Sequence, residues 1–279
     1  MILVDGNNLA YRYKRPPFVV FNKKTKHMEP VYKSAAGFPT GSIFGVLQSL
    51  IGLVKHCKDP HVVVAWDSKH NLRKSEKGYK ANRNHAHDGF IVEQMIVLHE
   101  VLPFYGFSSV KEFGYEADDI AFNFSKKYTD VTFISNDIDW MQFIDRRKRN
   151  CVYKQKEFYN TNPFNYDYRI YHSVVGSRKD NVIGIPYFKK KIAEKLAMKY
   201  TSIKTLIENE SGNYPKFKQL ERVLYNNYDL LTLKRIPGIF KKVRKAAYSS
   251  ILTAKINRYY TIDSKLDDQI HDLWSNHAK

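Results

Sequence analysis

The sequence predicts an α/β protein with a parallel sheet, helices on both faces of that sheet, and a helical C-terminal part. Two observations carry this prediction. Between residues 2 and 134, short apolar runs alternate with amphipathic helical segments, as in β–α–β units, whose crossovers cover a parallel sheet on both sides. From about residue 165 onward no run has strand character, and short helices with lysine-rich faces remain.

The alternating elements can be read in order from the period of their apolar residues. The expected elements are a strand at 2–4, a helix at 41–55, a strand at 62–66, a helix at 88–102, a strand at 107–113, a helix at 116–128 and a strand at 131–134. Two stretches interrupt the alternation. Residues 69–88 are almost free of apolar side chains and are therefore expected outside the core; long loops of this kind are usually functional or disordered. Residues 18–33 are a shorter insert of the same kind.

Composition describes a folded, basic chain. The 279 residues are 43% hydrophobic and 14% aromatic, enough to bury a sizeable core. The net charge of +18 is unevenly placed: residues 1–140 hold 18 basic and 15 acidic residues, whereas 141–279 hold 28 and 13. The basic half indicates a polyanionic partner, nucleic acid first and an anionic membrane second. The alternative is a solvated lysine-rich surface.

Several protein classes are excluded by the same inspection. The two cysteines, Cys57 and Cys151, form no CxxC motif, which argues against a disulfide scaffold and a structural zinc site. No apolar run approaches the roughly 18–20 residues of a membrane span, and the start of the chain does not resemble a signal peptide. We expect a soluble protein of a reducing compartment, without a membrane partner.

Acidic residues follow the expected strands. Because carboxyl ends of parallel strands share one edge of the sheet, these side chains should converge there. They are Asp5, Asp67, Glu116, Asp118, Asp119, Asp137 and Asp139. So many anions in one cleft need counter-charge, and oxygen ligands suit Mg²⁺ or Mn²⁺, while no His or Cys joins them to favour zinc. Each acid alone could be a turn or helix cap; acids at all four strand ends favour a metal site, and paired metals suit attack on a phosphodiester.

At this point the motifs resemble the 5′-nuclease (flap endonuclease) family, most of all its bacteriophage-encoded members, phage RNase H and the phage 5′–3′ exonuclease. The motifs occur in the family's order from residue 2 to about 195: VDGNNLAYRYK, VVVAWD, GYKANR, GYEADDIA, ISNDIDWMQF and VGSRKDNVIGI. EADD and NDIDW are specific, whereas the C-terminal third carries no specific motif. The resemblance implies a PIN-like nuclease core at 1–160, with a basic arch at about 69–88, and a helical duplex-binding region at 161–279 that contains a helix–hairpin–helix-like element.

The resemblance also implies roles for individual residues. The ligands of a first, catalytic metal would be Asp5, Asp67, Glu116 and Asp118, and the remaining shell with a second metal would be Asp119, Asp137, Asp139 and Asp180. Lys80 and Arg83 of GYKANR resemble the basic pair that approaches the scissile phosphate. Tyr79 is placed to stack on a base, and Arg73 and Lys77 join the arch's nucleic-acid contacts. Lysine and arginine neutralise phosphoryl charge, and an aromatic ring holds an unpaired base.

The sequence departs from the family pattern twice. Three residues before Asp180, where the family usually has an aspartate, stands Ser177, so the second of two Mg²⁺ (or Mn²⁺) ions is expected to bind more loosely. The helix–hairpin–helix loop, usually glycine-rich, reads GIPYFKKKIA, with Pro186, Tyr187 and Phe188 in place of small residues. We expect Lys189, Lys190 and Lys191 to contact phosphates there as point charges.

The function implied by the resemblance is metal-dependent cleavage of DNA and RNA/DNA duplexes at 5′ ends and flaps, with RNA-primer removal in phage replication. Its partners would be these nucleic acids, with single-strand DNA-binding protein and a sliding clamp beside them; we expect a monomer in the cytoplasm, that of the host cell if the gene is phage-borne. Two alternatives stay open: a PIN-type single-strand ribonuclease, and a catalytically silent structure-specific DNA-binding protein, motivated by Ser177.

Overall fold

The computed structural model describes residues 1–24, 26–75, 78–81, 89–145 and 147–277. Its strands are β1 (Ile2–Asp5), β2 (Val19–Asn22), β3 (His27–Pro30), β4 (Val62–Trp66), β5 (Ser108–Lys111), β6 (Thr132–Ile134), β7 (Cys151–Lys154) and β8 (Glu157–Tyr159). Its helices are α1 (Gly6–Tyr11), α2 (Gly41–Cys57), α3 (Gly89–Val101), α4 (Ala117–Lys127), α5 (Tyr168–Val175), α6 (Lys190–Lys199), α7 (Ile203–Glu210), α8 (Lys216–Gln219), α9 (Glu221–Leu231), α10 (Ser250–Tyr260) and α11 (Ser264–His277).

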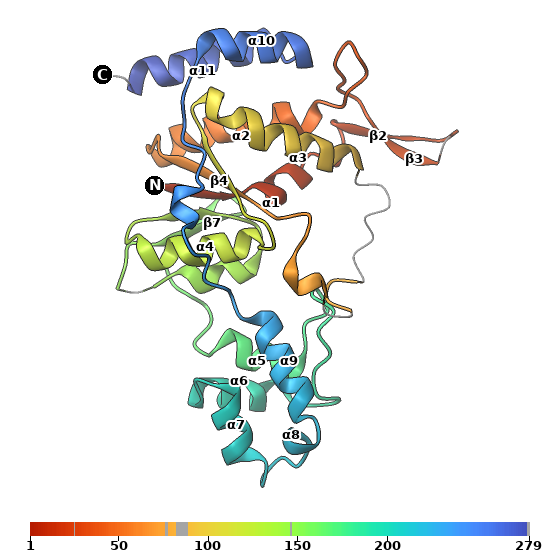
Figure 1. Cartoon of the computed structure of the whole chain (residues 1–279), viewed down its shortest axis with the longest axis vertical. Coiled ribbons are helices and arrows are strands. Elements are labelled where there is room, and N and C mark those ends of the chain that lie inside the picture. The colour runs from red at the N-terminus through yellow and green to blue at the C-terminus, as the bar shows by residue number, and fades with distance from the viewer. Residues whose placement is uncertain (25, 76–77, 82–88, 146, 278–279) are drawn as a thin grey trace.

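A six-stranded sheet in the order β5-β4-β1-β6-β7-β8 organises the upper part of the molecule (Figure 1). Every neighbouring pair is parallel except β7 and β8, which are antiparallel. Each predicted strand is present, β4 with the predicted boundaries and the others with boundaries shifted by one or two residues, and the β–α–β order is confirmed. The predicted α/β class with a mostly parallel sheet is therefore correct.

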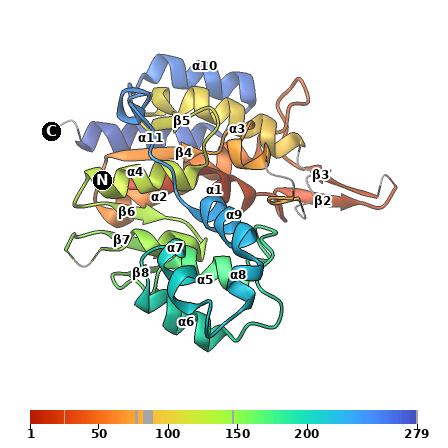
Figure 2. The ribbon, with the colours of Figure 1, turned by 60° about the horizontal axis from the view of Figure 1, so that its bottom comes forward.

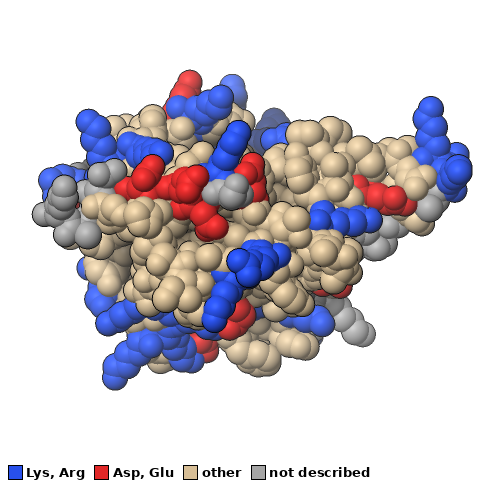
Figure 3. All heavy atoms as spheres, turned by 90° about the horizontal axis from the view of Figure 1, so that it is seen from above, with Lys and Arg blue, Asp and Glu red and all other residues tan. Residues whose placement is uncertain are grey.

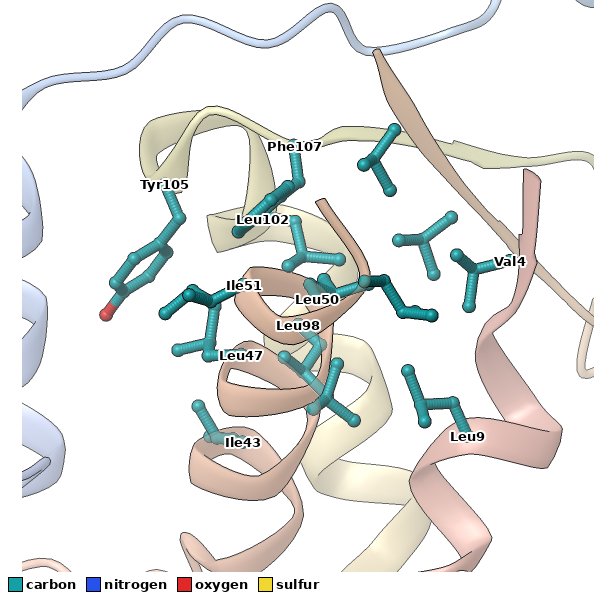
Figure 4. Close-up of a cluster of buried hydrophobic side chains, with 14 of the residues drawn as sticks. Val4, Leu9, Ile43, Leu47, Leu50, Ile51, Leu98, Leu102, Tyr105 and Phe107 are labelled. Atoms are coloured by element: carbon teal, nitrogen blue, oxygen red, sulfur yellow. The ribbon is translucent and has the colours of Figure 1, made fainter. Parts of the chain in front are cut away.

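The alternation of side chains along the central strands separates two cores. Ile2 and Val4 of β1 face a cluster formed with α1, α2, α3 and α11, whereas Leu3 faces a second cluster under α4. Successive residues of a strand point to opposite faces, so a run that is apolar throughout must be covered on both sides. Figure 4 shows part of the first cluster, in which Leu47 and Leu50 of α2 lie beside Leu98 of α3. Helices on both faces are thus confirmed.

The helices α5 to α9 form a second body below the sheet in Figures 1 and 2. Their core is separate from the two clusters of the sheet and includes Ile170, Leu196, Leu206 and Phe217. The chain then returns to the sheet: Ile236 joins the core under α4, α11 packs against α2, and α10 packs against α11. Within the described part of the chain, residues 160–277 contribute helices and no strand to the sheet, as the sequence predicted.

Three segments differ from the sequence expectation. The insert at 18–33 is a β2–β3 hairpin that projects from the body (Figures 1 and 2), and exposed Lys23, Lys24 and Lys26 lie around its tip, where Figure 3 shows basic side chains. Strands β7 and β8 extend the sheet beyond the four strands predicted. The stretch 69–88 was expected outside the core, yet its described part buries polar side chains, among them Arg73. The spacing of apolar residues predicts which apolar side chains are buried. It cannot predict that a charged side chain such as Arg73 is buried by its ion pairs.

Candidate active site

Three acidic residues lie at the carboxyl edge of the sheet because three adjacent strands end there. Asp5 ends β1, Asp67 follows β4 and Asp137 lies beyond β6. Asp5 also caps α1, with its carboxylate accepting hydrogen bonds from the Asn8 amide at 2.9 Å and from the Ser135 hydroxyl at 2.8 Å. The Ser135 bond ties β1 to β6, so the sheet itself brings these strand ends together.

The start of α4 adds three further carboxylates, those of Glu116, Asp118 and Asp119. Glu116 precedes the helix and Asp118 lies in its first turn. The Ala117 amide donates to the Asp67 carboxylate at 2.8 Å, and the Trp140 indole donates to the Asp118 carboxylate at 2.7 Å. Acidic side chains are favourable at a helix N-terminus, where backbone N–H groups are unpaired. The start of α4 is thereby joined to the ends of β4 and β6.

The carboxylates of the cluster are close enough to raise one another's pKa. Burial, with the nearby charges of Asp67 and Asp137, raises the pKa of Asp5 to about 7. Burial is also the largest reason why the pKa of Asp118 is raised well above its ordinary value; Lys80 opposes the rise, and Glu116, Asp137 and Asp5 add to it. Carboxylates in this state are stabilised as anions only when a cation joins them.

Glu116 has cationic partners within the chain. Its carboxylate accepts from the Arg73 guanidinium at 2.7 Å, from the Tyr79 hydroxyl at 3.2 Å and from the Lys80 ammonium. Burial would raise the pKa of Glu116, but Lys80 and Arg73 outweigh it and the pKa is lowered. Glu116 is therefore an anion held between two cations.

Asp119 is 1% exposed and is engaged by several donors. Arg73 donates to it at 2.5 Å, and the backbone amides of Lys234 and Glu116 donate at 2.7 and 3.1 Å. Arg73 also donates to the Thr232 carbonyl at 2.9 Å. Asp119 thus joins α4 to the 69–75 segment and to the chain that returns from the helical body. The sequence predicted that Asp119 belongs to the metal shell. To bind an ion there, its carboxylate would have to keep these hydrogen bonds and coordinate the ion at the same time.

The second carboxylate group lies beyond β6. Asp137 and Asp139 both pair with the ammonium of Lys179, which lies 2.8 Å from Asp139, and the Tyr168 hydroxyl donates to Asp139 at 2.6 Å. Asp180 is 5% exposed and accepts a hydrogen bond from the Ser177 hydroxyl at 2.8 Å. Sequence reasoning missed Lys179, Tyr168 and Trp140, because nothing in the local spacing indicates that they reach the carboxylates.

The donor chemistry of the first group fits a divalent cation. Asp5, Asp67, Glu116 and Asp118 supply oxygen only, the ligand set of hard cations. As the side chains stand, no three His, Cys, Asp or Glu residues within the described ranges are close enough to hold a metal ion. Glu116 is turned toward Lys80 and Arg73 instead, so a cation would compete with Lys80 for this carboxylate.

The residues expected to contact nucleic acid fall into three groups. Lys189, Lys190 and Lys191 are exposed at the start of α6. Arg73 and Tyr79 are 7% and 9% exposed, so neither offers a free surface to a base or phosphate in this arrangement. Lys77 and Arg83 lie outside the described residues. Of the two expected basic catalytic residues, Lys80 is thus the one that the structure places at the carboxylates.

No helix in the described ranges is both long and apolar enough to cross a membrane.

The fold resembles solved nuclease structures. The bacteriophage T5 D15 protein co-crystallised with metal ions matches with a TM-score of 0.61 at 17% identity, over 98% of each chain. A pseudo-enzyme–product complex of the bacteriophage T5 D15 flap endonuclease with DNA and metal ions matches with a TM-score of 0.59 at 18% identity, over 100% of this chain and 99% of that one.

Curated relatives agree at the level of sequence. The 5′–3′ exonuclease of Aquifex aeolicus is 28% identical over 75% of this chain and 72% of its own length. DNA polymerase I of Caldicellulosiruptor bescii is 25% identical over 75% of this chain, and the match spans only 25% of that polymerase. The family model described as "5′-3′ exonuclease, N-terminal resolvase-like domain" matches residues 1–173. With its mostly parallel sheet and the carboxylates at one edge, the chain belongs to this 5′–3′ exonuclease family.

Proposed function

We propose that this chain is a metal-dependent 5′-nuclease that hydrolyses phosphodiester bonds at 5′ ends and flaps of DNA and of RNA/DNA duplexes. One observation carries the proposal: carboxylates from β1, β4 and the start of α4 share one edge of the sheet with the ammonium of Lys80. Nuclease activity of the family, and the DNA in the T5 D15 complex, support this choice of substrate. Primer removal during phage replication is the role that such an activity would serve.

Each part of the site has a role in this proposal. Asp5, Asp67, Glu116 and Asp118 hold Mg²⁺ or Mn²⁺. When bound, the ion supplies an activated water and neutralises phosphoryl charge. Lys80 approaches the scissile phosphate as a point charge and stabilises the charge that develops on it.

The duplex is held outside this edge. Exposed Lys189, Lys190 and Lys191 contact its phosphates without reading bases, and Lys77 and Arg83 add contacts from the arch. Arg73 and Tyr79 donate hydrogen bonds to the Glu116 carboxylate. Tyr79 can stack on a base only if its hydroxyl gives up this hydrogen bond and its ring moves to the surface. Single-strand DNA-binding protein and a sliding clamp remain the proposed protein partners of a monomeric enzyme.

The direct test is cleavage of a 5′-labelled flap duplex with Mg²⁺ titrated upward. We expect products with 5′-phosphate and 3′-hydroxyl ends from the unchanged chain and none from Asp118→Asn, whose duplex binding should persist. Asp268→Asn, an exposed carboxylate on α11, is the matched control and should cut normally. Binding without product at any Mg²⁺ concentration would favour a silent DNA-binding protein, and cleavage of single-stranded RNA alone would favour a PIN-type ribonuclease.

A further inference from the structure

The side chain of Lys179 occupies the space between Asp137 and Asp139. Its ammonium pairs with one oxygen of each carboxylate. The other Asp137 oxygen accepts from the Asp139 amide at 3.1 Å, and the other Asp139 oxygen accepts from the Tyr168 hydroxyl at 2.6 Å. All four carboxylate oxygens of the pair therefore have a donor, and their cationic donor belongs to the chain itself.

The loop that carries Lys179 is held in place on both sides. Ser177 and Val182 exchange two backbone hydrogen bonds of 2.9 Å, which close the turn that contains Lys179. The Ser177 hydroxyl donates to Asp180 within the same turn. Gly176, at φ +85°, lies so close to Gly184 that a Cβ there would come within 2.8 Å of the Gly184 amide. The position of Lys179 is thus set by a closed turn and not by a free surface loop.

The surroundings of this pair differ from those of the first carboxylate group. In the first group Glu116 is paired with Lys80 and Arg73, whereas Asp5 and Asp118 accept hydrogen bonds from neutral donors: the Asn8 amide, the Ser135 hydroxyl and the Trp140 indole. Their negative charge is not balanced by those contacts. Asp137 and Asp139 instead share a full positive charge, because an ammonium keeps its proton at neutral pH. A second cation at this pair would face the ammonium at contact distance and would be repelled by it.

Ser177 also makes this half of the site less favourable for a second divalent ion. Its hydroxyl brings no charge to Asp180, so the turn contributes one carboxylate and one ammonium to this half of the site. A divalent ion prefers a set of several anionic oxygens. Each carboxylate of the Asp137–Asp139 pair already shares the charge of Lys179.

We infer that Lys179 is the resident cation of the Asp137–Asp139 pair, and that this chain binds one divalent ion, at the first carboxylate group, where two were expected. The inference rests on the proposed function, because it assigns that function's second cation position to a side chain. An ammonium neutralises charge at this position but cannot polarise a water or a phosphoryl oxygen as a Lewis acid does. Lys179 is accordingly a positioning residue that sets how many metal ions the site takes.

The test is a count of bound Mn²⁺ in the absence of nucleic acid, by electron paramagnetic resonance of the free ion and by calorimetry. We expect one ion per chain for the unchanged protein and two for Lys179→Met, whose side chain keeps its length and loses its charge. Lys179→Arg, which keeps the charge, should still bind one ion. Because outer partners of a metal site usually change affinity by roughly 10- to 100-fold, the second ion should bind at least about tenfold more tightly in Lys179→Met than in the unchanged chain.

Two results would overturn the inference: two ions of similar affinity in the unchanged chain, or a single ion in Lys179→Met. Lys179→Gln repeats the test with a polar side chain, and circular dichroism shows that each variant is folded; Lys179 is 41% exposed, so folding should not depend on it. Asp118→Asn in the same titration reports on the first site. A chain that cuts flap DNA but binds two ions overturns the inference alone, whereas a chain that binds no Mn²⁺ and cuts nothing overturns the proposed function as well.

Discussion

The backbone amide of Lys80 donates a hydrogen bond of 2.9 Å to the carbonyl oxygen of Asp180. A second bond, from the Asn181 side chain to the Gly78 carbonyl at 2.7 Å, runs beside it. These contacts join residues 78–81 to the turn after α5. They fix the backbone from which the Lys80 ammonium reaches Glu116, so the position of this cation depends on the helical body as well as on the sheet.

Replacing Lys80 with alanine should slow cleavage far more than it weakens binding. Removing one group that stabilises transition-state charge commonly costs roughly 10²- to 10³-fold in rate, whereas duplex affinity is spread over many phosphate contacts. Single-turnover cleavage and equilibrium binding of a flap duplex measure the two effects separately. Lys265→Ala, on the exposed face of α11, is the control and should change neither. A loss of affinity as large as the loss of rate would make Lys80 a docking residue.

Replacing Arg73 with methionine should destabilise the fold. The guanidinium is buried against Glu116, Asp119 and the Thr232 carbonyl, and its removal leaves two buried carboxylates short of a partner. Breaking a buried ion pair in this way costs about 3–5 kcal/mol. Urea unfolding at neutral pH measures the change. The exposed Arg147, which pairs with Asp145, offers the contrast: Arg147→Met should leave the urea midpoint unchanged, and an equal effect of both variants would contradict the argument.

Replacing Gly106 with alanine should loosen the contact between α11 and the sheet. Gly106 has φ +85°, and a Cβ there would come within 2.3 Å of the Trp274 ring, whose indole donates to the Tyr105 carbonyl. Strain and overpacking of this kind cost about 1–3 kcal/mol. Gly52 of α2 faces open space, so Gly52→Ala should stabilise the protein by up to about 1 kcal/mol. Thermal unfolding should show a lower melting temperature for Gly106→Ala and a higher one for Gly52→Ala.

His99 should make stability fall as the solution is acidified. The Ser109 hydroxyl accepts from the Trp66 indole and forms a second hydrogen bond of 2.8 Å with Nδ1 of the His99 ring. Burial is the main reason why the pKa of His99 is lowered from 6.5 to about 4; Glu100 opposes the shift, and Arg244 and Lys111 add to it. The folded state favours the neutral ring, so the stabilisation is complete above pH 6.5 and is lost between pH 6.5 and pH 4.

The measurement for this prediction compares melting temperatures from about pH 7 to about pH 4.5, across the range in which the ring titrates, in the unchanged chain and in His99→Gln. Glutamine keeps an acceptor for Ser109 and cannot be protonated in this range. The unchanged chain should lose more of its melting temperature on acidification than the variant does. Parallel curves would show that His99 does not cause the loss.

Four strands of the sheet and the acidic residues at its carboxyl edge were predictable because they depend on local patterns. Continuous apolar runs mark the strands around Val4 and Val64, and a carboxylate that follows such a run must lie at the sheet edge. The hairpin at β2–β3 and the strands β7 and β8 were not predictable in this way. Apart from the buried Val19 and Val152, their residues are mostly polar or partly exposed, so pairing with a neighbour contributes more than burial to making them strands.

The acidic residues of the candidate site were easier to predict from the sequence than the ion pairs that they form. The acidic positions Asp5, Asp67 and Asp118 could be named from sequence, whereas the internal cations could not, because Arg73, Lys80 and Lys179 reach their partners across the fold. A basic residue in a polar loop is ordinarily expected at the surface. Arg73 does not follow this expectation, because it is buried behind Glu116 together with Tyr79.

The packing of α11 makes completion of the core around β1 a long-range event in folding. Leu266, Ile270 and Leu273 belong to the same buried cluster as Ile2 and Val4 of β1. Until α11 packs, part of the cluster that β1 shares with it stays uncovered. The strand that carries Asp5 is therefore fully packed only when a helix more than two hundred residues away in the sequence has docked on the same cluster.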